Sequence, residues 1–125
     1  MPKILVVDDD LSNAEVIQLV LENEGFEVER ICHSIQLEPS IAQFCPDLVL
    51  MDILLDAHDG RDICNDLKAD QSTSHIPVML ITAMLESQVG TIVCDADAIM
   101  FKPFEYTVLV NKVRKVLRSA TKIRN

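Results

Sequence analysis

Three short, unbroken apolar runs constrain the fold of this chain more than any other feature of its sequence. They are Ile4-Leu5-Val6-Val7, Leu48-Val49-Leu50-Met51 and Val78-Met79-Leu80-Ile81. Runs of this length without polar alternation are typical of strands buried on both faces of a parallel sheet. Two weaker runs, at 27–31 and 98–101, are the remaining strand candidates.

Helical patterns fill the gaps between these runs. Ser12 and Glu15 have the spacing of a capping box, and Gly25 supplies a left-handed stop after the apolar stripe that follows them. Further helices are predicted over 35–44, after Gly60, and from near Glu105 to residue 118. The segment 85–93 has Gly90 and β-branched residues, so only a short or mobile helix is expected there. Strand and helix thus alternate five times, which predicts an α/β doubly wound five-stranded parallel sheet in a three-layer sandwich.

Charge is unevenly distributed along the 125 residues, a length that suits a single domain over 1–125 with a core at about 3–118. Residues 1–101 contain 19 acidic and 4 basic residues, a net charge of −15, whereas residues 102–125 have a net charge of +6. An acidic body of this kind argues against direct nucleic-acid binding. No segment is apolar and long enough to span a membrane and no leader opens the chain, so a cytoplasmic protein is expected. Because only a basic tail at 119–125 follows the last predicted helix, no DNA-binding domain is expected after it.

The four cysteines do not suggest a disulfide framework or a zinc site. Cys32, Cys45, Cys64 and Cys94 are far apart in the sequence and form no C-x-x-C pair. His33 adjoins Cys32, but no second ligand pair completes a zinc site. We expect these cysteines to be small core or half-buried residues.

Polar side chains follow four of the five predicted strands. The first strand is followed by Asp8-Asp9-Asp10, the third by Asp52, the fourth by Thr82 and the fifth by Lys102. In doubly wound folds the ligand site lies beyond the carboxyl ends of the strands, so these side chains are expected to share one crevice.

The residue types in this crevice indicate phosphoryl chemistry. Asp8, Asp9 and Asp52 would oppose one another's ionisation, and a hard divalent cation such as Mg²⁺, with Mn²⁺ as the alternative, would relieve that repulsion. The Asp52 carboxylate could then attack phosphorus and form an acyl phosphate. Lys102 would supply a positive charge for one phosphoryl oxygen, and Thr82 a hydroxyl donor for another.

The chain resembles the receiver domains of two-component response regulators, a CheY-like family. The matching motifs are VVDDD at 6–10, LVLMD at 48–52, DG at 59–60, ITA at 81–83 and KPF at 102–104. The resemblance implies the flavodoxin-like (βα)5 arrangement with strand order 2-1-3-4-5. It makes Asp52 the phosphoacceptor, and it puts Asp9, Asp52 and the Leu54 carbonyl on the metal, with Asp8 bound through water.

The same resemblance implies a cis peptide at Lys102-Pro103 and a particular set of partners. These are a sensor histidine kinase or a histidine phosphotransfer protein as donor and an unknown downstream protein; the oligomeric state stays open. The domain would then be a signalling module that catalyses its own phosphorylation and dephosphorylation, not an enzyme with a free substrate.

The same residues are compatible with two other functions. The segment Asp8–Ser12 also resembles the D-x-D-x-S nucleophile loop of haloacid-dehalogenase-type phosphatases, but in that family the extra acids follow the lysine, whereas Asp52 precedes Lys102. A pseudo-receiver that binds without phosphorylation usually lacks the acceptor, the acidic pair or the lysine, all of which are present here. Asp10 is interpreted as a capping residue, and Asp56, His58 and Asp59 as a solvated loop.

Several positions depart from the family pattern. Asp56 replaces a usual proline, Ile99 a usual aromatic residue, and Asp95 a usual glycine, and the stretch between Thr82 and Lys102 is about two residues short. These departures predict an altered surface around the fourth helix and fifth strand. Leu54 and Met84 are apolar at positions that control the approach of water in this family, which predicts a long-lived phosphorylated state.

Overall fold

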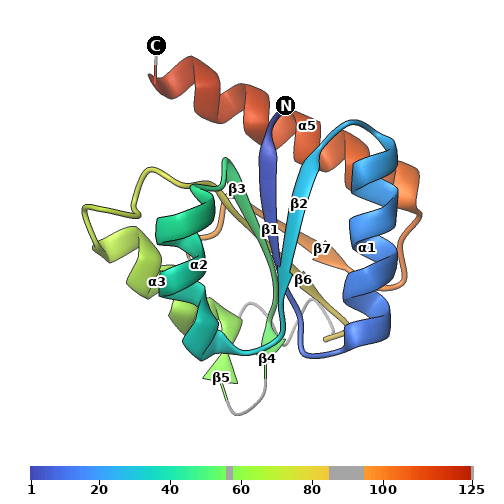
Figure 1. Cartoon of the computed structure of the whole chain (residues 1–125), viewed down its shortest axis with the longest axis horizontal. Coiled ribbons are helices and arrows are strands. Elements are labelled where there is room, and N and C mark those ends of the chain that lie inside the picture. Colours follow the sequence, from blue (N-terminus) through green and yellow to red (C-terminus); the bar gives the residue numbers. More distant parts are fainter. Residues whose placement is uncertain (56–57, 85–94, 125) are drawn as a thin grey trace.

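A computed structural model describes residues 1–55, 58–84 and 95–124 of the chain (Figure 1). The strands are β1 (Lys3–Val7), β2 (Glu27–Ile31), β3 (Leu48–Asp52), β4 (Leu54–Leu55), β5 (His58–Asp59), β6 (Val78–Thr82) and β7 (Ala98–Phe101). The helices are α1 (Leu11–Asn23), a 3₁₀ turn η1 (Ser34–Gln36), α2 (Leu37–Phe44), α3 (Gly60–Ala69) and α5 (Tyr106–Arg124). The helix expected within 85–93 lies outside the described residues.

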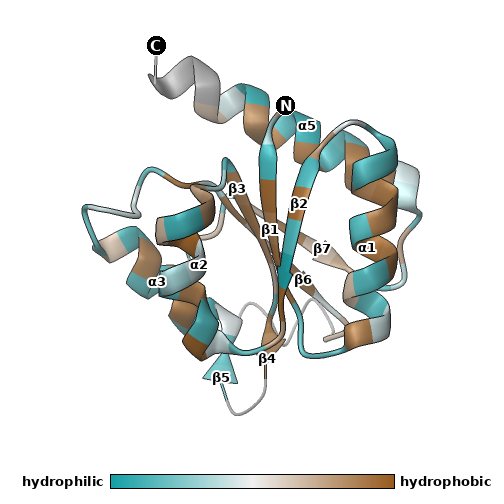
Figure 2. Cartoon of the chain, viewed as in Figure 1, coloured by the Kyte–Doolittle hydropathy of each residue, from teal (hydrophilic) through white to brown (hydrophobic). Residues whose placement is uncertain are grey.

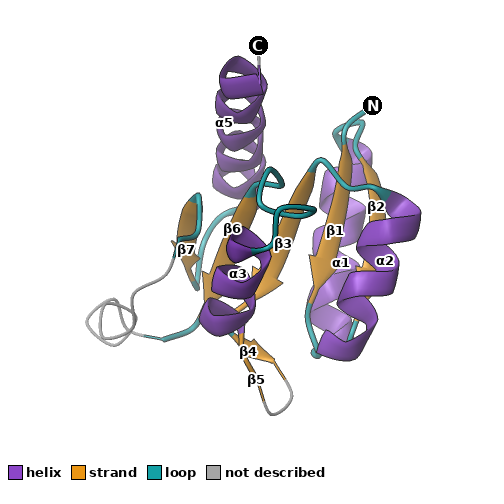
Figure 3. Ribbon diagram, turned by 90° about the vertical axis from the view of Figure 1, so that its left-hand side faces the viewer, coloured by secondary structure: helices purple, strands orange, loops and turns teal. Residues whose placement is uncertain are grey.

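Five strands form one parallel sheet in the order β2-β1-β3-β6-β7. Since β6 and β7 are the fourth and fifth of the predicted strands, the predicted order 2-1-3-4-5 is confirmed. Helices α1 and α5 cover one face of the sheet, and α2 and α3 cover the other (Figures 1 and 3). The fold is therefore the expected flavodoxin-like, doubly wound sandwich.

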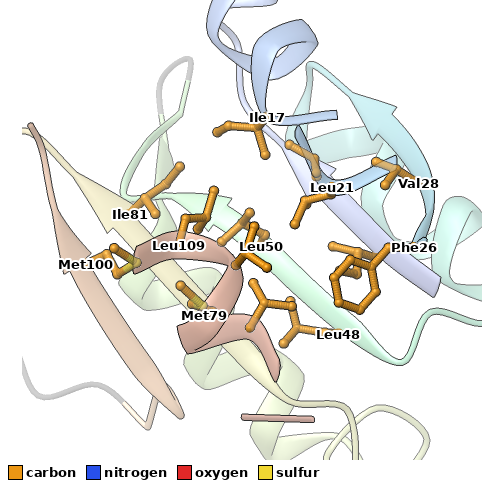
Figure 4. Packing of buried hydrophobic residues seen from close by; sticks show 14 of the residues in the cluster. Ile17, Leu21, Phe26, Val28, Leu48, Leu50, Met79, Ile81, Met100 and Leu109 are labelled. Carbon is orange, nitrogen blue, oxygen red and sulfur yellow. The ribbon is translucent and has the colours of Figure 1, made fainter. Parts of the chain in front are cut away.

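The core lies on both faces of the sheet because successive strand residues point in opposite directions. In β1, Ile4 and Val6 belong to the cluster under α1 and α5, whereas Leu5 and Val7 belong to the cluster under α2 and α3. Figure 4 shows the first of these clusters, and Figure 2 shows apolar residues along most of β3 beside helices in which apolar and polar residues alternate. Burial on both sides explains why β1, β3 and β6 are unbroken apolar runs in the sequence.

The caps of the first two helices differ in part from the prediction. The N-cap of α1 is Asp10, whose carboxylate accepts a hydrogen bond from the Asn13 amide at 3.1 Å. The predicted Ser12–Glu15 capping box is therefore wrong, since the helix begins one residue before Ser12, whereas the capping role of Asp10 is confirmed. Gly25, with φ +94°, provides the expected left-handed stop. Helix α2 begins at Leu37, because the three residues before it form a 3₁₀ turn.

Helix α5 continues to Arg124, past the end predicted at residue 118. No glycine or proline follows Arg118 in the sequence, so nothing interrupts the helical pattern there. Its inward residues Leu109, Val113 and Val116 are buried as expected. Across the part of the chain that the structure describes, no helix combines the length and apolarity needed to cross a membrane.

The cysteine prediction holds for two of the three cysteines in the described residues. Cys64 is buried and Cys32 is half-buried, but Cys45 is exposed, contrary to expectation. Cys45 ends α2 in a left-handed conformation with φ 52°, which turns its side chain out of the helix packing. Cys94 lies outside the described residues.

Candidate functional site

Asp52 ends β3 and is held by two donors at the carboxyl edge of the sheet. Its Oδ1 accepts a hydrogen bond from the Leu54 amide at 3.0 Å, and its Oδ2 lies 3.2 Å from Nζ of Lys102. The residue is 8% exposed, so the carboxylate lies at the surface of the crevice rather than in bulk solvent. The structure thus joins two predicted site residues that are 50 positions apart in the sequence.

Lys102 reaches Asp52 because the chain turns sharply after β7. The Lys102 amide donates to the Thr82 carbonyl at 2.7 Å, which extends the pairing of β6 and β7 by one step. The next peptide bond, Lys102-Pro103, is cis, as the family resemblance implied. The backbone of Lys102 is therefore fixed at the sheet edge, and its side chain extends toward β3.

Asp8 follows β1 and is nearly fully buried, at 1% exposed. Its Oδ1 accepts from the Asp10 amide at 2.9 Å, and its Oδ2 accepts from Nδ2 of Asn13 at 2.5 Å. Burial raises the pKa of this carboxyl above its ordinary value, and the neighbouring Asp52 charge adds to the rise. The two hydrogen bonds and Lys102 lower the pKa and only partly offset that effect. Asp8 thus carries a negative charge that the protein alone does not fully compensate.

Thr82 ends β6 and is completely buried. Its Oγ1 accepts a hydrogen bond from the Met84 amide at 3.0 Å. Among the described residues its hydroxyl donates to no acceptor, so the hydrogen is available for an oxygen placed in the crevice. The predicted role of Thr82 as a hydroxyl donor is compatible with this geometry.

The predicted metal ligands are only partly assembled. Asp9 is exposed, and within residues 1–55, 58–84 and 95–124 no three His, Cys, Asp or Glu side chains form a group that could hold a metal ion. Mg²⁺ needs only one or two carboxylates, because water, a carbonyl and a phosphate oxygen complete its shell. The hard oxygen donors of Asp8 and Asp52, with the undercompensated charge at Asp8, fit such an ion.

Gly60 is a site residue whose importance the sequence pattern did not reveal. Its amide donates to the Ile53 carbonyl at 2.6 Å, and a Cβ added to it would lie only 2.5 Å from the backbone oxygen of Asp52. In the sequence the Asp59-Gly60 pair matches a family motif and equally fits a simple turn. Its structural role is instead to let α3 begin in direct contact with the strand end that presents Asp52.

The segment around Asp59 is ordered, contrary to the predicted solvated loop. His58 and Asp59 form β5, which pairs antiparallel with β4. Asp59 caps α3 by accepting from the Arg61 amide at 2.8 Å, and it pairs with the buried Arg61 guanidinium at 2.7 Å. The hydrogen bonds from Arg61 lower the pKa of Asp59. Asp56, also assigned to that loop, lies outside the described residues.

Comparison with known proteins identifies the family of this chain. A model of the response regulator receiver domain matches residues 4–114. The chain is 39% identical over 118 residues to the DNA-binding response regulator MtrA of Mycobacterium tuberculosis, covering 93% of this chain and 50% of MtrA. It is 32% identical over 122 residues to the phosphate regulon transcriptional regulatory protein PhoB of Rhizobium meliloti, covering 96% of this chain and 54% of PhoB. The chain thus spans about half the length of the curated relatives it matches.

Solved structures of receiver domains have the same fold. The signal receiver domain of a signal transduction histidine kinase from Syntrophus aciditrophicus matches with a TM-score of 0.87 and 29% identity, over 95% of this chain and 92% of that one. A CheY-like receiver domain protein from Methanospirillum hungatei matches with a TM-score of 0.83 and 29% identity, over 98% of both chains. These matches favour the receiver interpretation over the phosphatase alternative. The chain belongs to the response regulator receiver domain family of two-component signal transduction.

Proposed function

We propose that Asp52 accepts a phosphoryl group from a phosphohistidine donor and that the acyl phosphate switches a protein-binding surface. The observation that carries this proposal is the pairing of the Asp52 carboxylate with Lys102 at 3.2 Å, in a crevice bordered by buried Asp8 and Thr82. One oxygen of Asp52 attacks phosphorus, the bond from phosphorus to the donor imidazole nitrogen breaks, and that nitrogen keeps the electron pair. The receiver domain is a signalling domain, and no free substrate is turned over.

The side chains around Asp52 have complementary tasks in this transfer. Lys102 can follow a phosphoryl oxygen with its flexible ammonium group, and Thr82 can donate its free hydroxyl hydrogen to another oxygen. By the family resemblance, Asp9, Asp52 and the Leu54 carbonyl would hold Mg²⁺ directly and Asp8 would hold it through water, with Mn²⁺ as an alternative ion. When bound, the cation would neutralise negative charge on the phosphoryl oxygens.

The partners follow from the same chemistry. A sensor histidine kinase or a histidine phosphotransfer protein would supply the phosphoryl group. Exposed apolar side chains near the crevice offer a contact surface, since Leu11 at the start of α1 is 62% exposed and Leu54 is 58% exposed. Relatives such as MtrA are named as DNA-binding regulators, but the net charge of −9 in this chain supports contact with proteins rather than with nucleic acid.

Phosphorylation with acetyl phosphate and Mg²⁺ tests the proposal. We expect the intact mass of the wild-type chain to rise by one phosphoryl group, and Asp52→Asn to remain unmodified. Asp10→Asn is the matched control, because asparagine caps a helix about as well as aspartate and Asp10 does not touch Asp52. No modification of the wild type would favour a pseudo-receiver, and equal modification of Asp52→Asn would exclude Asp52 as the acceptor.

The metal is tested separately by binding. Calorimetric titration of Mg²⁺ into the unphosphorylated chain should show one site, which Asp8→Ala weakens by at least about tenfold because a buried carboxylate that holds the ion through water is lost. Unchanged Mg²⁺ affinity in Asp8→Ala would remove Asp8 from the metal site.

A further inference from the structure

The two helix pairs that cover the sheet pack differently. On one face, α5 reaches α1 and its neighbouring loop directly: Arg114 pairs with Glu24 at 3.0 Å and lies over the Phe26 ring. On the other face, a groove of about 830 Å³ separates α2 from α3. The two helices lie side by side over that face in Figure 3. We refer to this cavity as the α2–α3 groove.

The floor of the α2–α3 groove is apolar. Leu37 and Ile41 of α2, Leu67 of α3 and Ile76 before β6 line it, and each is at most 8% exposed. Ile35 also lines the groove and is 85% exposed. A large aliphatic side chain this exposed beside an apolar floor indicates a surface that gains stability when a partner covers it.

The rim of the groove is acidic. The lining residues in the described part of the chain include Glu38, Asp47, Asp66 and Asp70 but no lysine or arginine. Glu38 on α2 and Asp66 on α3 have no hydrogen bond or ion pair to their side chains from any described residue. The C-terminal ends of α2 and α3 also border the groove, and the helix dipole makes these ends partly negative. An occupant that brings positive charge is therefore favoured.

The topology favours a helical occupant over an extended one. An extended peptide binds by pairing with a free strand edge. The strands between the two edges of the sheet, β1, β3 and β6, are each paired on both sides, so the groove offers no such edge. A helix satisfies its own backbone and presents apolar residues at helical spacing with charges beside them.

We propose that the α2–α3 groove is a docking site for a basic amphipathic helix of a partner protein. The apolar stripe of that helix would cover Ile35, Ile41 and Leu67, and its lysines or arginines would approach Glu38 and Asp66. The groove is lined by η1, α2, α3 and the loops that follow the two helices, and none of the Asp52 crevice residues lines it. The proposed docking site is therefore distinct from the phosphorylation site.

The test uses the full chain labelled with ¹⁵N and a synthetic peptide of leucine and lysine only, with leucines at helical spacing. We expect amide shifts at the groove residues. The double variant Glu38→Lys and Asp66→Lys should weaken peptide binding by at least about tenfold. The matched control, Glu15→Lys and Glu22→Lys on α1, changes the net charge equally on exposed residues and should weaken binding by less than about threefold.

Ile35→Gln isolates the apolar contribution, because Ile35 is too exposed for its loss to unfold the chain. We expect this variant to weaken binding by about threefold to tenfold. Absence of binding, shifts centred on α1, or equal loss in both charge variants would overturn the proposal. Dimerisation of the chain alone through the groove, seen by sedimentation and by concentration-dependent shifts, would identify a second copy as the occupant and also overturn it.

Discussion

At the amino end of the sheet, carboxylates hold neighbouring strands together. Asp47 accepts a hydrogen bond from the Lys3 amide at 2.8 Å, and Asp97 accepts from the Val78 amide at 2.8 Å while pairing with Lys68 at 2.8 Å. At the carboxyl end, Asp8 and Asp52 face the same crevice and only one cation, Lys102, pairs with either of them among the described residues.

The carboxylates at the amino end of the sheet stabilise the fold, whereas those at the carboxyl end form the functional site. At the amino end each carboxylate satisfies a backbone amide, so its charge is compensated in the folded protein. At the carboxyl end burial and like charge leave the site dependent on something from outside, a cation or a phosphoryl group. Substitutions at the two ends should therefore affect different measurements.

The largest difference in phosphorylation rate is expected between substitutions of the two lysines, Lys102 at the carboxyl end and Lys68 at the amino end. Lys102→Ala should slow phosphorylation by acetyl phosphate about 100-fold, because it removes the charge that faces the phosphoryl oxygens. The same substitution should change the free energy of unfolding by about 1 kcal/mol or less, since the Lys102 side chain is partly exposed. Lys68→Ala, at the amino end, should leave the rate unchanged and lower the free energy of urea unfolding. A similar loss of rate in both variants would contradict the separation.

Substitutions at two glycines, Gly60 near the carboxyl end of the sheet and Gly25 near the amino end, test the same difference. Gly60→Ala would put a Cβ 2.5 Å from the Asp52 oxygen and should lower the free energy of unfolding by about 2 kcal/mol. It should also slow phosphorylation, since the end of β3 must shift. Gly25→Ala meets no atom within 4 Å and only strains a positive φ, so it should cost about 1 kcal/mol without changing the rate. Urea unfolding and the phosphorylation rate should be measured for both variants; an equal rate in Gly60→Ala and Gly25→Ala would contradict the expectation.

Asp97→Ala should destabilise the amino end alone. It leaves the buried Val78 amide without its acceptor and Lys68 without its partner, at a cost of about 1.5 kcal/mol in urea unfolding. The phosphorylation rate per folded molecule should equal that of the wild type. A slower rate would mean that the two ends of β6 are coupled.

Whereas Asp97→Ala should destabilise the folded chain, Asp8→Asn should stabilise it when no divalent cation is present. Because the pKa of Asp8 is raised in the folded state, its ionisation favours unfolding above that pKa. In EDTA at pH 7 the free energy of unfolding of the variant should be about 1 kcal/mol higher than that of the wild type. The gain should shrink as the pH falls and disappear below the ordinary pKa of 3.8, where Asp8 is protonated in both states. A gain that persists at low pH would assign the effect to packing.

The strands and the site residues at their ends were predictable because parallel strands leave strong local signals. A strand buried on both faces must be an apolar run, and the carboxyl ends of such strands meet at one edge, so Asp8, Asp52, Thr82 and Lys102 could be grouped from sequence alone. The exposure of Asp9 was not predictable, because adjacent residues in a loop can point to opposite sides.

The contacts that sequence patterns missed are those between residues whose local signals are ambiguous. Asp59-Gly60 looks like any turn, and only the approach of α3 to β3 shows why glycine is required there. The hydrogen bond from Asn13 to Asp8 depends on where α1 begins, and the apparent capping box at Ser12 put that start in the wrong place. The end of α5 was misplaced because a basic, polar segment can continue a helix when no breaker stops it.

The smallest effect concerns the lifetime of the phosphorylated state. Leu54 follows Asp52 by two residues and is 58% exposed, and its apolar side chain has no group that could order a water molecule by a hydrogen bond. Leu54→Asn would place a hydrogen-bonding group there, and we expect it to speed loss of the phosphoryl group about threefold, a barrier change of about 0.65 kcal/mol. Leu19→Asn is the matched control, because Leu19 is a 60% exposed leucine on α1. Decay of the phosphorylated mass after removal of acetyl phosphate measures both variants, and equal decay in Leu54→Asn and the wild type would show that side-chain polarity at this position does not control water.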